Sequence, residues 1–232
     1  MNANLHKLMA LSLAAATCAA LGSSAFAGKE YPELPLKITD ETPAQKDARL
    51  AWWVRDRFGM FIHFGLYAVP ARHEWVKSNE YIDDKTYDSK YLPRFNPDLY
   101  DAKDWVRQAK QAGMKYMVLT VKHHEGFCMW DTKTTDYKIT NTDFKRDLVR
   151  EYVDACREAG MRVGFYFSIK DWHHPDYLID ATHPLRPRDQ KTWSKETFAK
   201  LNEGKDWNRY RKYMWDQVDE LLTDYGKIDI IW

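Results

Sequence analysis

The sequence predicts an α/β fold in which parallel strands alternate with helices. Short, almost continuous apolar runs, of the kind that form buried parallel strands, are separated by segments with helical spacing. A glycine closes each of the three helical segments that lie between these runs, as at helix C-terminal caps. Polar and titratable residues gather directly after the apolar runs, where parallel α/β folds carry their functional side chains. This pattern indicates the first half of a (β/α)8 TIM barrel, with four parallel strands.

The first predicted strand and the helix after it occupy residues 57–65 and 98–112. The strand is mostly apolar and ends at His63. The helix has one apolar face, and Gly113 closes it. That face is formed by Leu99, Ala102, Trp105, Val106 and Ala109. The second strand, residues 116–121, follows at once, and a strand–helix–strand unit of this kind builds a parallel sheet.

The same unit repeats twice more along the chain. Residues 147–159 have helical spacing, and residues 162–168 form the third predicted strand. A further helix is predicted over residues 207–225, and residues 228–232 form the fourth strand. Gly160 and Gly226 close the two helices. We therefore expect four strands joined by right-handed crossovers.

Titratable side chains follow three of the four predicted strands. They are His63 after the first strand, His123 and His124 after the second, and Asp171, His173 and His174, with the hydroxyl of Ser168, after the third. A doubly wound open sheet is the alternative architecture. No strand is followed by a Gly-x-Gly-x-x-Gly turn, so the sequence gives no support for dinucleotide binding.

Residues 1–27 have the pattern of a secretory signal peptide. His6 and Lys7 precede an apolar stretch at residues 8–21, and Ala25-Phe26-Ala27 fits a cleavage site. The apolar stretch is short for a membrane span. We expect cleavage after Ala27 and export to the periplasm or the outside of the cell, or to a lysosome-type compartment in a eukaryote, without attachment to a membrane.

The composition gives no sign of a nucleic-acid or membrane partner. The chain has 35 Lys and Arg against 34 Asp and Glu, so it has no electrostatic attraction for polyanions. Ten Trp and fourteen Tyr are a heavy aromatic load, which suits stacking on sugars but also suits a large core. Signal removal would leave Cys128 and Cys156, which we expect to be free, partly buried thiols.

Four sequence blocks resemble the α-L-fucosidases of glycoside hydrolase family 29. The blocks are Phe58-Gly59-Met60-Phe61-Ile62-His63-Phe64-Gly65, His73-Glu74-Trp75, Lys122-His123-His124-Glu125-Gly126-Phe127, and Gly164-Phe165-Tyr166-Phe167-Ser168 with Asp171-Trp172. They occur in the family's order, and the resemblance runs from about Tyr31 to Trp232. It implies an exo-acting, retaining glycosidase that releases terminal α-L-fucose from fucosylated glycans.

The resemblance also implies a set of substrate-binding residues. These are His63, Glu74, Trp75, His123, His124 and Tyr166. The chemistry of these side chains agrees, because a monosaccharide pocket needs several directional hydrogen bonds and an apolar wall. The family implies no cofactor and no metal ion.

The resemblance places the catalytic carboxylates beyond this sequence. Retaining glycosidases use two carboxyl groups about 5 Å apart. In the family the nucleophile is an aspartate just after the fourth strand, which we expect just beyond Trp232, and the acid/base lies further on. Asp229 lies inside the predicted strand and is a poor substitute. Residues 28–232 are then the incomplete N-terminal half of a catalytic domain, truncated at its C-terminal side and without hydrolytic activity of its own.

Two alternatives remain open at this point. The first alternative to a fucosidase fragment is a non-catalytic, fucose-binding or inactive half-barrel product. The second, suggested by His123 and His124, is part of a metal-dependent barrel hydrolase. Zinc needs three or four ligands, and neighbouring strand residues point to opposite faces, so a turn would have to bring the two imidazoles together.

Two further expectations concern loops and edges. Residues 179–204 read as an exposed insertion without a recognisable motif, and His173 and His174 have no assigned role. A half barrel would also leave apolar residues at unpaired edges, which predicts that the chain expressed alone is insoluble, self-associated or partly molten. These residues are Phe61, Ile62, Phe165, Ile230 and Ile231.

Overall fold

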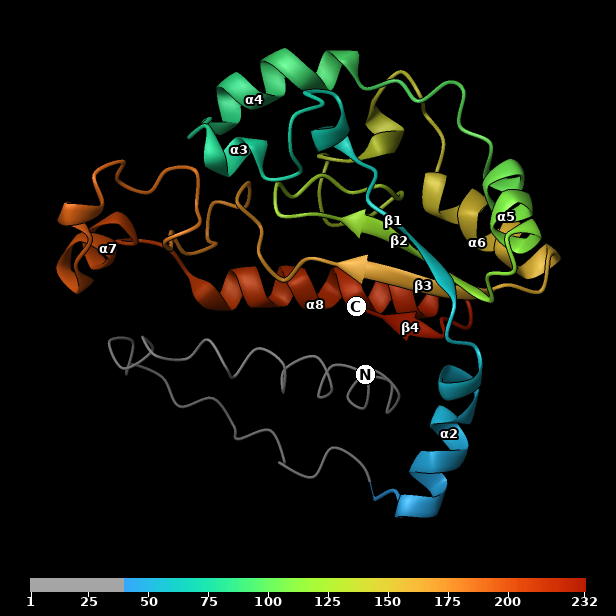
Figure 1. Ribbon diagram of the computed structural model, residues 1–232. Coiled ribbons are helices and arrows are strands. Elements are labelled where there is room, and N and C mark those ends of the chain that lie inside the picture. The colour runs from blue at the N-terminus through green and yellow to red at the C-terminus, as the bar shows by residue number, and fades with distance from the viewer. Residues whose placement is uncertain (1–39) are drawn as a thin grey trace. The chain divides into compact units, whose positions relative to one another are not determined.

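A computed structural model describes residues 40–232, in which four strands form one parallel sheet (Figure 1). The strands are β1 (Gly59–Ile62), β2 (Tyr116–Lys122), β3 (Arg162–Phe167) and β4 (Ile230–Ile231). They lie in the order β1-β2-β3-β4, and each neighbouring pair is parallel. The predicted fold class, with parallel strands and intervening helices as in the first half of a (β/α)8 barrel, is confirmed.

The predicted signal peptide at residues 1–27 lies outside the described residues. Within residues 40–232, no helix combines the length and the apolar character that a membrane crossing requires. The chain divides into two compact units between Arg57 and Phe58. The described part of the first unit contains helix α2 (Pro43–Arg55), which the sequence analysis did not predict. Thr42 and Gln45 form a capping box at its start.

The three helices predicted between strands are present in the second unit. They are α5 (Ala102–Gln111), α6 (Leu148–Glu158) and α8 (Trp207–Thr223). Each begins after an aspartate whose side chain accepts a hydrogen bond from a backbone N–H of the first turn. The prediction that Leu99 belongs to the apolar face of this helix is wrong. Asp101 caps α5, and Leu99 precedes the helix with 93% of its surface exposed.

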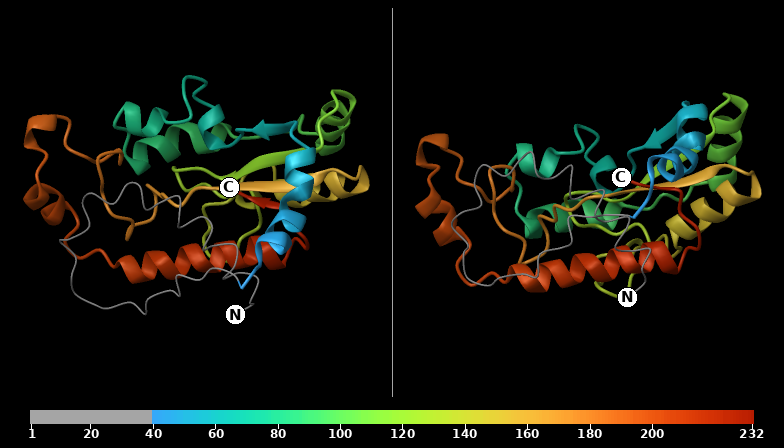
Figure 2. Two further views of the ribbon diagram at one scale, coloured as in Figure 1. Left: turned by 60° about the horizontal axis from the view of Figure 1, so that its bottom comes forward. Right: turned by 90° about the horizontal axis from the view of Figure 1, so that it is seen from below.

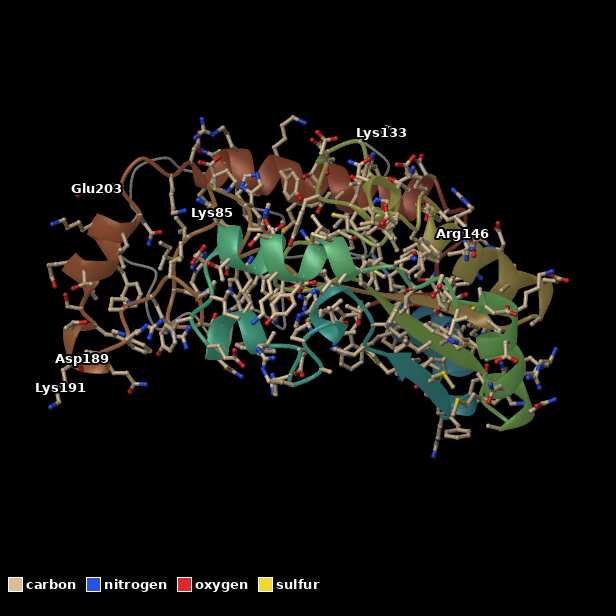
Figure 3. The ribbon with its side chains drawn as sticks, turned by 90° about the horizontal axis from the view of Figure 1, so that it is seen from above. Lys85, Lys133, Arg146, Asp189, Lys191 and Glu203 are labelled. Atoms are coloured by element: carbon tan, nitrogen blue, oxygen red, sulfur yellow. The ribbon has the colours of Figure 1, made fainter. Side chains whose placement is uncertain are left out.

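Shorter elements fill the loops at the carboxyl ends of the strands. The helices are α3 (Val76–Asn79), α4 (Asp84–Tyr91) and α7 (Lys195–Leu201), and the 3₁₀ turns are η3 (Leu66–Ala68), η4 (Leu92–Arg94), η5 (Ile139–Asn141) and η6 (Gln190–Thr192). The segment 179–204 therefore carries structure of its own. Most of it is exposed, and Asp189 and Lys191 project from its outer end (Figure 3). Ile179 and His183, however, are buried, which corrects the expectation of a wholly exposed insertion.

The register of the sheet gives its two faces different roles. Ile62, Leu119, Phe165 and Ile231 form one aligned row. Helix α6 packs on β2 and β3, and α5 packs beside α6, while α8 runs along the sheet (Figures 1 and 2). Leu119 and Phe165 are fully buried, so the prediction that Phe165 is an exposed edge residue is wrong.

The opposite face carries Phe61, Gly164 and Ile230 in the neighbouring row. Gly164 is required there, because a Cβ would lie 2.9 Å from the backbone oxygen of Met117. Two residues further along the strands, the same face presents His63, Tyr166 and Trp232. Phe61 and Trp232 are 42% and 62% exposed, so the predicted exposure of apolar side chains at β1 is confirmed for Phe61.

Candidate functional site

A cluster of aromatic and imidazole rings lies at the carboxyl ends of β1, β2 and β3. His63 follows β1, His123 follows β2, and Tyr166 lies near the end of β3. The ring centroid of His63 lies 5.6 Å from that of His123 and 5.5 Å from that of Tyr166. The rings of His123 and Tyr166 are stacked at 5.9 Å. Because the strands are parallel, their carboxyl ends lie side by side, and residues that are far apart in the chain meet there.

The two adjacent histidines lie on the same side of the strand end. Their ring centroids are 4.3 Å apart, whereas consecutive residues of a regular strand point to opposite faces. The register between β2 and β3 shifts between Thr120 and Lys122, and β2 ends at Lys122. The chain then turns, with the backbone N–H of Gly126 donating to the carbonyl of His123 at 3.0 Å. This irregular strand end brings both imidazoles into the cluster.

Two tryptophans form an apolar wall beside His124. The ring of Trp75 lies 4.9 Å from that of His124 and 5.3 Å from that of Trp172. Trp172 lies 5.0 Å from His124 and is fully buried, whereas Trp75 is partly exposed. The hydroxyl of Ser168 hydrogen-bonds to Nδ1 of His124. The open side of this wall is therefore formed by Trp75.

Glu74 reaches the cluster through its charge. Its carboxylate acts electrostatically on His63, Tyr67 and Tyr166, and it is partly exposed. Oε2 of Glu74 lies 3.5 Å from Nδ1 of His73. The backbone N–H of Trp75 donates to the same nitrogen at 2.9 Å, which fixes the turn that carries both residues. The structure thus brings five of the predicted site residues into ring contact, His63, Trp75, His123, His124 and Tyr166, and Glu74 precedes Trp75 in the same turn.

Burial keeps two of the three imidazoles neutral near pH 7. It lowers the pKa of His63, and the neighbouring His123 lowers it further. Burial, again with a contribution from His123, lowers the pKa of His124 to about 3. A neutral imidazole has one donor and one acceptor nitrogen. The pKa of Tyr166 is raised by burial, so its phenol also stays neutral. The cluster offers both hydrogen-bond polarities to a neutral, hydroxyl-rich ligand.

A buried charged network begins at Lys122, the last residue of β2, next to His123 in the chain. The ammonium of Lys122 lies 3.1 Å from Oδ2 of Asp171 and donates to Oε1 of Gln217 at 2.8 Å. All three side chains are buried. Burial alone would raise the pKa of Asp171, but the charge and hydrogen bond of Lys122, with contributions from His173 and His174, lower it overall. Oδ1 of Asp171 accepts the backbone N–H groups of His173 and His174. The network therefore links β2, the loop after β3 and helix α8.

His173 and His174, which had no predicted role, pack into the loops around the site. The ring of His173 stacks on Tyr137 at 3.8 Å, and its Nε2 lies 3.0 Å from Oδ2 of Asp88. The ring of His174 lies 4.5 Å from that of Tyr213. Across the described residues 40–232, no group of three or more His, Cys, Asp or Glu side chains is arranged to hold a metal ion.

Asp229 lies away from the cluster, at the amino end of β4. Its carboxylate accepts the backbone N–H of Val163 at 3.0 Å and lies 3.4 Å from Arg162, the first residue of β3. Asp229 is therefore a structural residue at the amino ends of the strands. This agrees with the prediction that it is a poor substitute for a catalytic carboxylate.

The comparison with known proteins agrees with this geometry. A family model described as alpha-L-fucosidase matches residues 35–232. The chain belongs to the α-L-fucosidase family. The tissue alpha-L-fucosidase of Homo sapiens is 31% identical over 170 residues, which cover 66% of this chain and 36% of the human protein. The plasma alpha-L-fucosidase of Homo sapiens is 34% identical over 168 residues, which cover 64% and 36%. The chain thus spans a little over a third of the length of these relatives.

Solved α-L-fucosidase structures share the fold. Alpha-L-fucosidase isoenzyme 1 from Paenibacillus thiaminolyticus superposes with a TM-score of 0.73 at 53% identity, covering 81% of this chain and 42% of that one. A glycoside hydrolase family 29 enzyme from Bacteroides thetaiotaomicron gives 0.65 at 34% identity, covering 83% and 40%. Alpha-L-fucosidase AlfC from Lactobacillus casei, solved with its alpha-L-fucose product, gives 0.67 at 31% identity, covering 79% and 61%. The family resemblance read from the sequence blocks is confirmed.

Three neighbours of this ring cluster were not predicted as site residues. Tyr67 lies in η3, and its ring is 4.8 Å from that of His123. Phe61 stacks on His63 at 5.3 Å, and Trp232 meets Phe61 edge to face at 5.6 Å. The two-residue alternation from His63 back to Phe61 could have indicated Phe61. Nothing in the sequence indicated that Tyr67 returns to the cluster.

Proposed function

We propose that this chain forms the fucose-binding part of an exo-acting, retaining α-L-fucosidase. The carrying observation is that His63, His123, His124 and Tyr166, from three strand ends, meet in one ring cluster beside Trp75. Neutral imidazoles and a phenol supply donors and acceptors for the sugar hydroxyls. Trp75 supplies an apolar surface for the C–H face of the ring. The substrate is then a terminal α-L-fucose of a fucosylated glycan.

The catalytic nucleophile is assigned to an aspartate one or two residues after Trp232. The backbone N–H of Trp232 donates to the carbonyl of Phe165, and its carbonyl accepts from Phe167, so the main chain at Trp232 follows β3 to its carboxyl end. By strand alternation, the second residue after Trp232 would lie on the same face as Tyr166 and His63, on the side where the sugar would bind. In this proposal an aspartate there attacks the anomeric carbon and an acid/base further along the chain protonates the leaving oxygen. A structure of the Bacteroides thetaiotaomicron relative, which trapped a covalent intermediate from 2-fluoro-fucosyl fluoride, supports the retaining mechanism.

The proposal includes export. Residues 1–27 would direct the protein out of the cytoplasm and be removed after Ala27, as their sequence pattern suggests. Sequencing the N-terminus of the exported protein tests this part. A mature protein that begins at Met1 would contradict it.

The test of the activity uses the product of the full gene and an aryl α-L-fucoside. We expect release of L-fucose whose first-formed anomer, read by proton NMR, is α. His63→Ala and His123→Ala should each lower kcat/KM by about tenfold to a hundredfold, since each removes a hydrogen-bonding group of the proposed sugar site. Lys191→Ala, on the exposed end of segment 179–204, is the control and should leave kcat/KM unchanged (Figure 3).

The same assay separates the non-catalytic alternative. The chain of residues 28–232 should bind L-fucose in saturation-transfer NMR and release none from the aryl fucoside. Binding by the full gene product without hydrolysis would favour a sugar-binding protein and overturn the enzymatic proposal. Hydrolysis by the isolated chain would overturn the assignment of the nucleophile beyond Trp232.

A further inference from the structure

Glu125 is a buried carboxylate directly behind the proposed sugar site. It follows His123 and His124 in the turn after β2, and only 2% of its surface is exposed. Its Oε2 has no hydrogen-bond partner within the described residues, and Nδ1 of His123 lies 3.5 Å from that oxygen. His123 is equally buried, and its Nδ1 likewise has no other partner within the described residues. The carboxylate oxygen and this ring nitrogen are therefore two unpaired polar atoms that can pair with each other.

No other side chain of the described residues makes a hydrogen bond to Oε2 of Glu125. The charge of Glu125 raises the pKa values of Tyr67 and Tyr87, both already raised by burial, and no hydrogen bond joins either hydroxyl to Glu125. The ammonium of Lys77 is paired with Asp84 at 2.7 Å and lies over the ring of Tyr87. A carboxylate away from water needs a donor, and the nearest ring nitrogen that can carry a proton belongs to His123.

The orientation of the His123 ring follows from this pair. With the Glu125 carboxylate 3.5 Å from Nδ1 and no other partner at that nitrogen in the described residues, the proton belongs on Nδ1, and Nε2 is left as an acceptor. The rings nearest to His123 are His124, Tyr67 and His63, at centroid distances of 4.3, 4.8 and 5.6 Å. The acceptor nitrogen thus belongs to a residue in the middle of the cluster, where a sugar hydroxyl needs a defined polarity.

We propose that Glu125 is a positioning residue that holds His123 with its proton on Nδ1, so that Nε2 accepts a hydrogen bond from a hydroxyl of the bound sugar. The second half of this statement rests on the proposed function. The first half concerns the protein without ligand. The two halves are tested separately.

The tautomer is measured on the full gene product with nitrogen-15 in its histidines. Two-bond proton–nitrogen NMR spectra distinguish a protonated Nδ1 from a protonated Nε2. We expect His123 to carry its proton on Nδ1 in the wild type and in Glu125→Asp, and to shift toward Nε2–H in Glu125→Met. Asp88→Asn is the matched control, because its carboxylate pairs with His173 and should change only the His173 signals.

Wild-type His123 with its proton on Nε2, or a Glu125→Met spectrum identical to the wild type, would overturn the proposal. Where Glu125→Met does not fold, by circular dichroism, Glu125→Gln is used instead. Its amide is a weaker acceptor than a carboxylate, so it should give a mixture of both tautomers. An unmixed Nδ1–H signal in Glu125→Gln would likewise argue against the carboxylate.

The consequence for the sugar is measured on the full gene product with an aryl α-L-fucoside. Glu125→Met should raise KM about tenfold, with a smaller fall in kcat, because the lost hydrogen bond serves binding. Glu125→Asp should recover KM to within about threefold of the wild type. A fall in kcat with KM unchanged would assign Glu125 a different role. A full-length protein without fucosidase activity would remove the proposed function and leave the tautomer result standing.

Discussion

The ammonium of Lys122 lies 3.1 Å from the carboxylate of Asp171, and both side chains are buried. Lys122→Met should lower the free energy of unfolding by about 3–5 kcal/mol, because it leaves the Asp171 charge buried without its partner. Urea denaturation followed by circular dichroism measures the change. Lys103→Met, which removes an exposed pair with Glu158, is the control and should cost about 1 kcal/mol or less. Equal effects of the two substitutions would show that the buried pair has no special importance.

Gly126 has φ +85° and packs against the same aspartate. A Cβ at this position would lie 2.3 Å from Oδ1 of Asp171, whereas a Cβ at Gly113, with φ +87°, meets nothing within 4 Å. Gly113→Ala should therefore cost about 1–2 kcal/mol from the left-handed backbone alone. Gly126→Ala should cost about 1–3 kcal/mol more, because it also displaces Asp171. Urea midpoints of the two variants measure the difference, and identical midpoints would contradict the predicted clash.

Stability should fall when the solution is made acidic from pH 6.5. Burial lowers the pKa of His124 to about 3 and that of His183 to about 4. Below pH 6.5 these two histidines are protonated in the unfolded chain but remain neutral in the folded protein. Each therefore lowers the free energy of unfolding by up to about 1.4 kcal/mol per pH unit. The loss continues until the pH reaches the folded pKa.

His183→Gln isolates one of these contributions. Urea midpoints at pH 6.5, 5.7 and 5.0 should fall more steeply in the wild type than in the variant. This range lies above the pKa values of the carboxylates, so their titration does not confuse the result. Parallel lines for the two proteins would contradict the prediction.

Cys128 and Cys156 should be unreactive in the folded protein. Both are free and fully buried, and burial raises the pKa of the Cys156 thiol to about 12 and that of Cys128 further. Iodoacetamide at pH 8 should modify neither residue within an hour, and both should be modified in 8 M urea, as read by peptide mass spectrometry. Rapid labelling of either thiol without denaturant would show that its surroundings open.

The strands and the long helices could be predicted because their patterns are local. The apolar run at β2 and the glycine after α5 depend only on neighbouring residues, and both gave element ends within a few residues. The prediction for Leu99 was wrong because it extended the helix face past Asp101, whose side chain caps the helix. Helix α4 has a weak apolar pattern, and its buried Tyr87 and Tyr91 contact residues that the sequence alone does not place beside it.

The site could be predicted only as far as the family blocks reached. His63, His123 and Tyr166 lie in those blocks, and their meeting follows from a parallel sheet. The side-by-side arrangement of His123 and His124 depends on the irregular end of β2, which strand alternation does not anticipate. The contact between Lys122 and Gln217 joins positions 95 residues apart, and no local pattern reveals it.

The strand order β1-β2-β3-β4 follows the chain, so each strand pairs with the one synthesised before it. A nascent polypeptide can therefore extend this sheet while it is still being translated, without waiting for a later strand to be inserted between earlier ones. At roughly 5–20 residues per second, the ribosome needs several seconds to pass from β2 to helix α8. During that interval Lys122 exists without Gln217. The ammonium of Lys122 can pair with Asp171 once the loop after β3 has been made, but its hydrogen bond to Gln217 forms only when α8 packs beside the sheet.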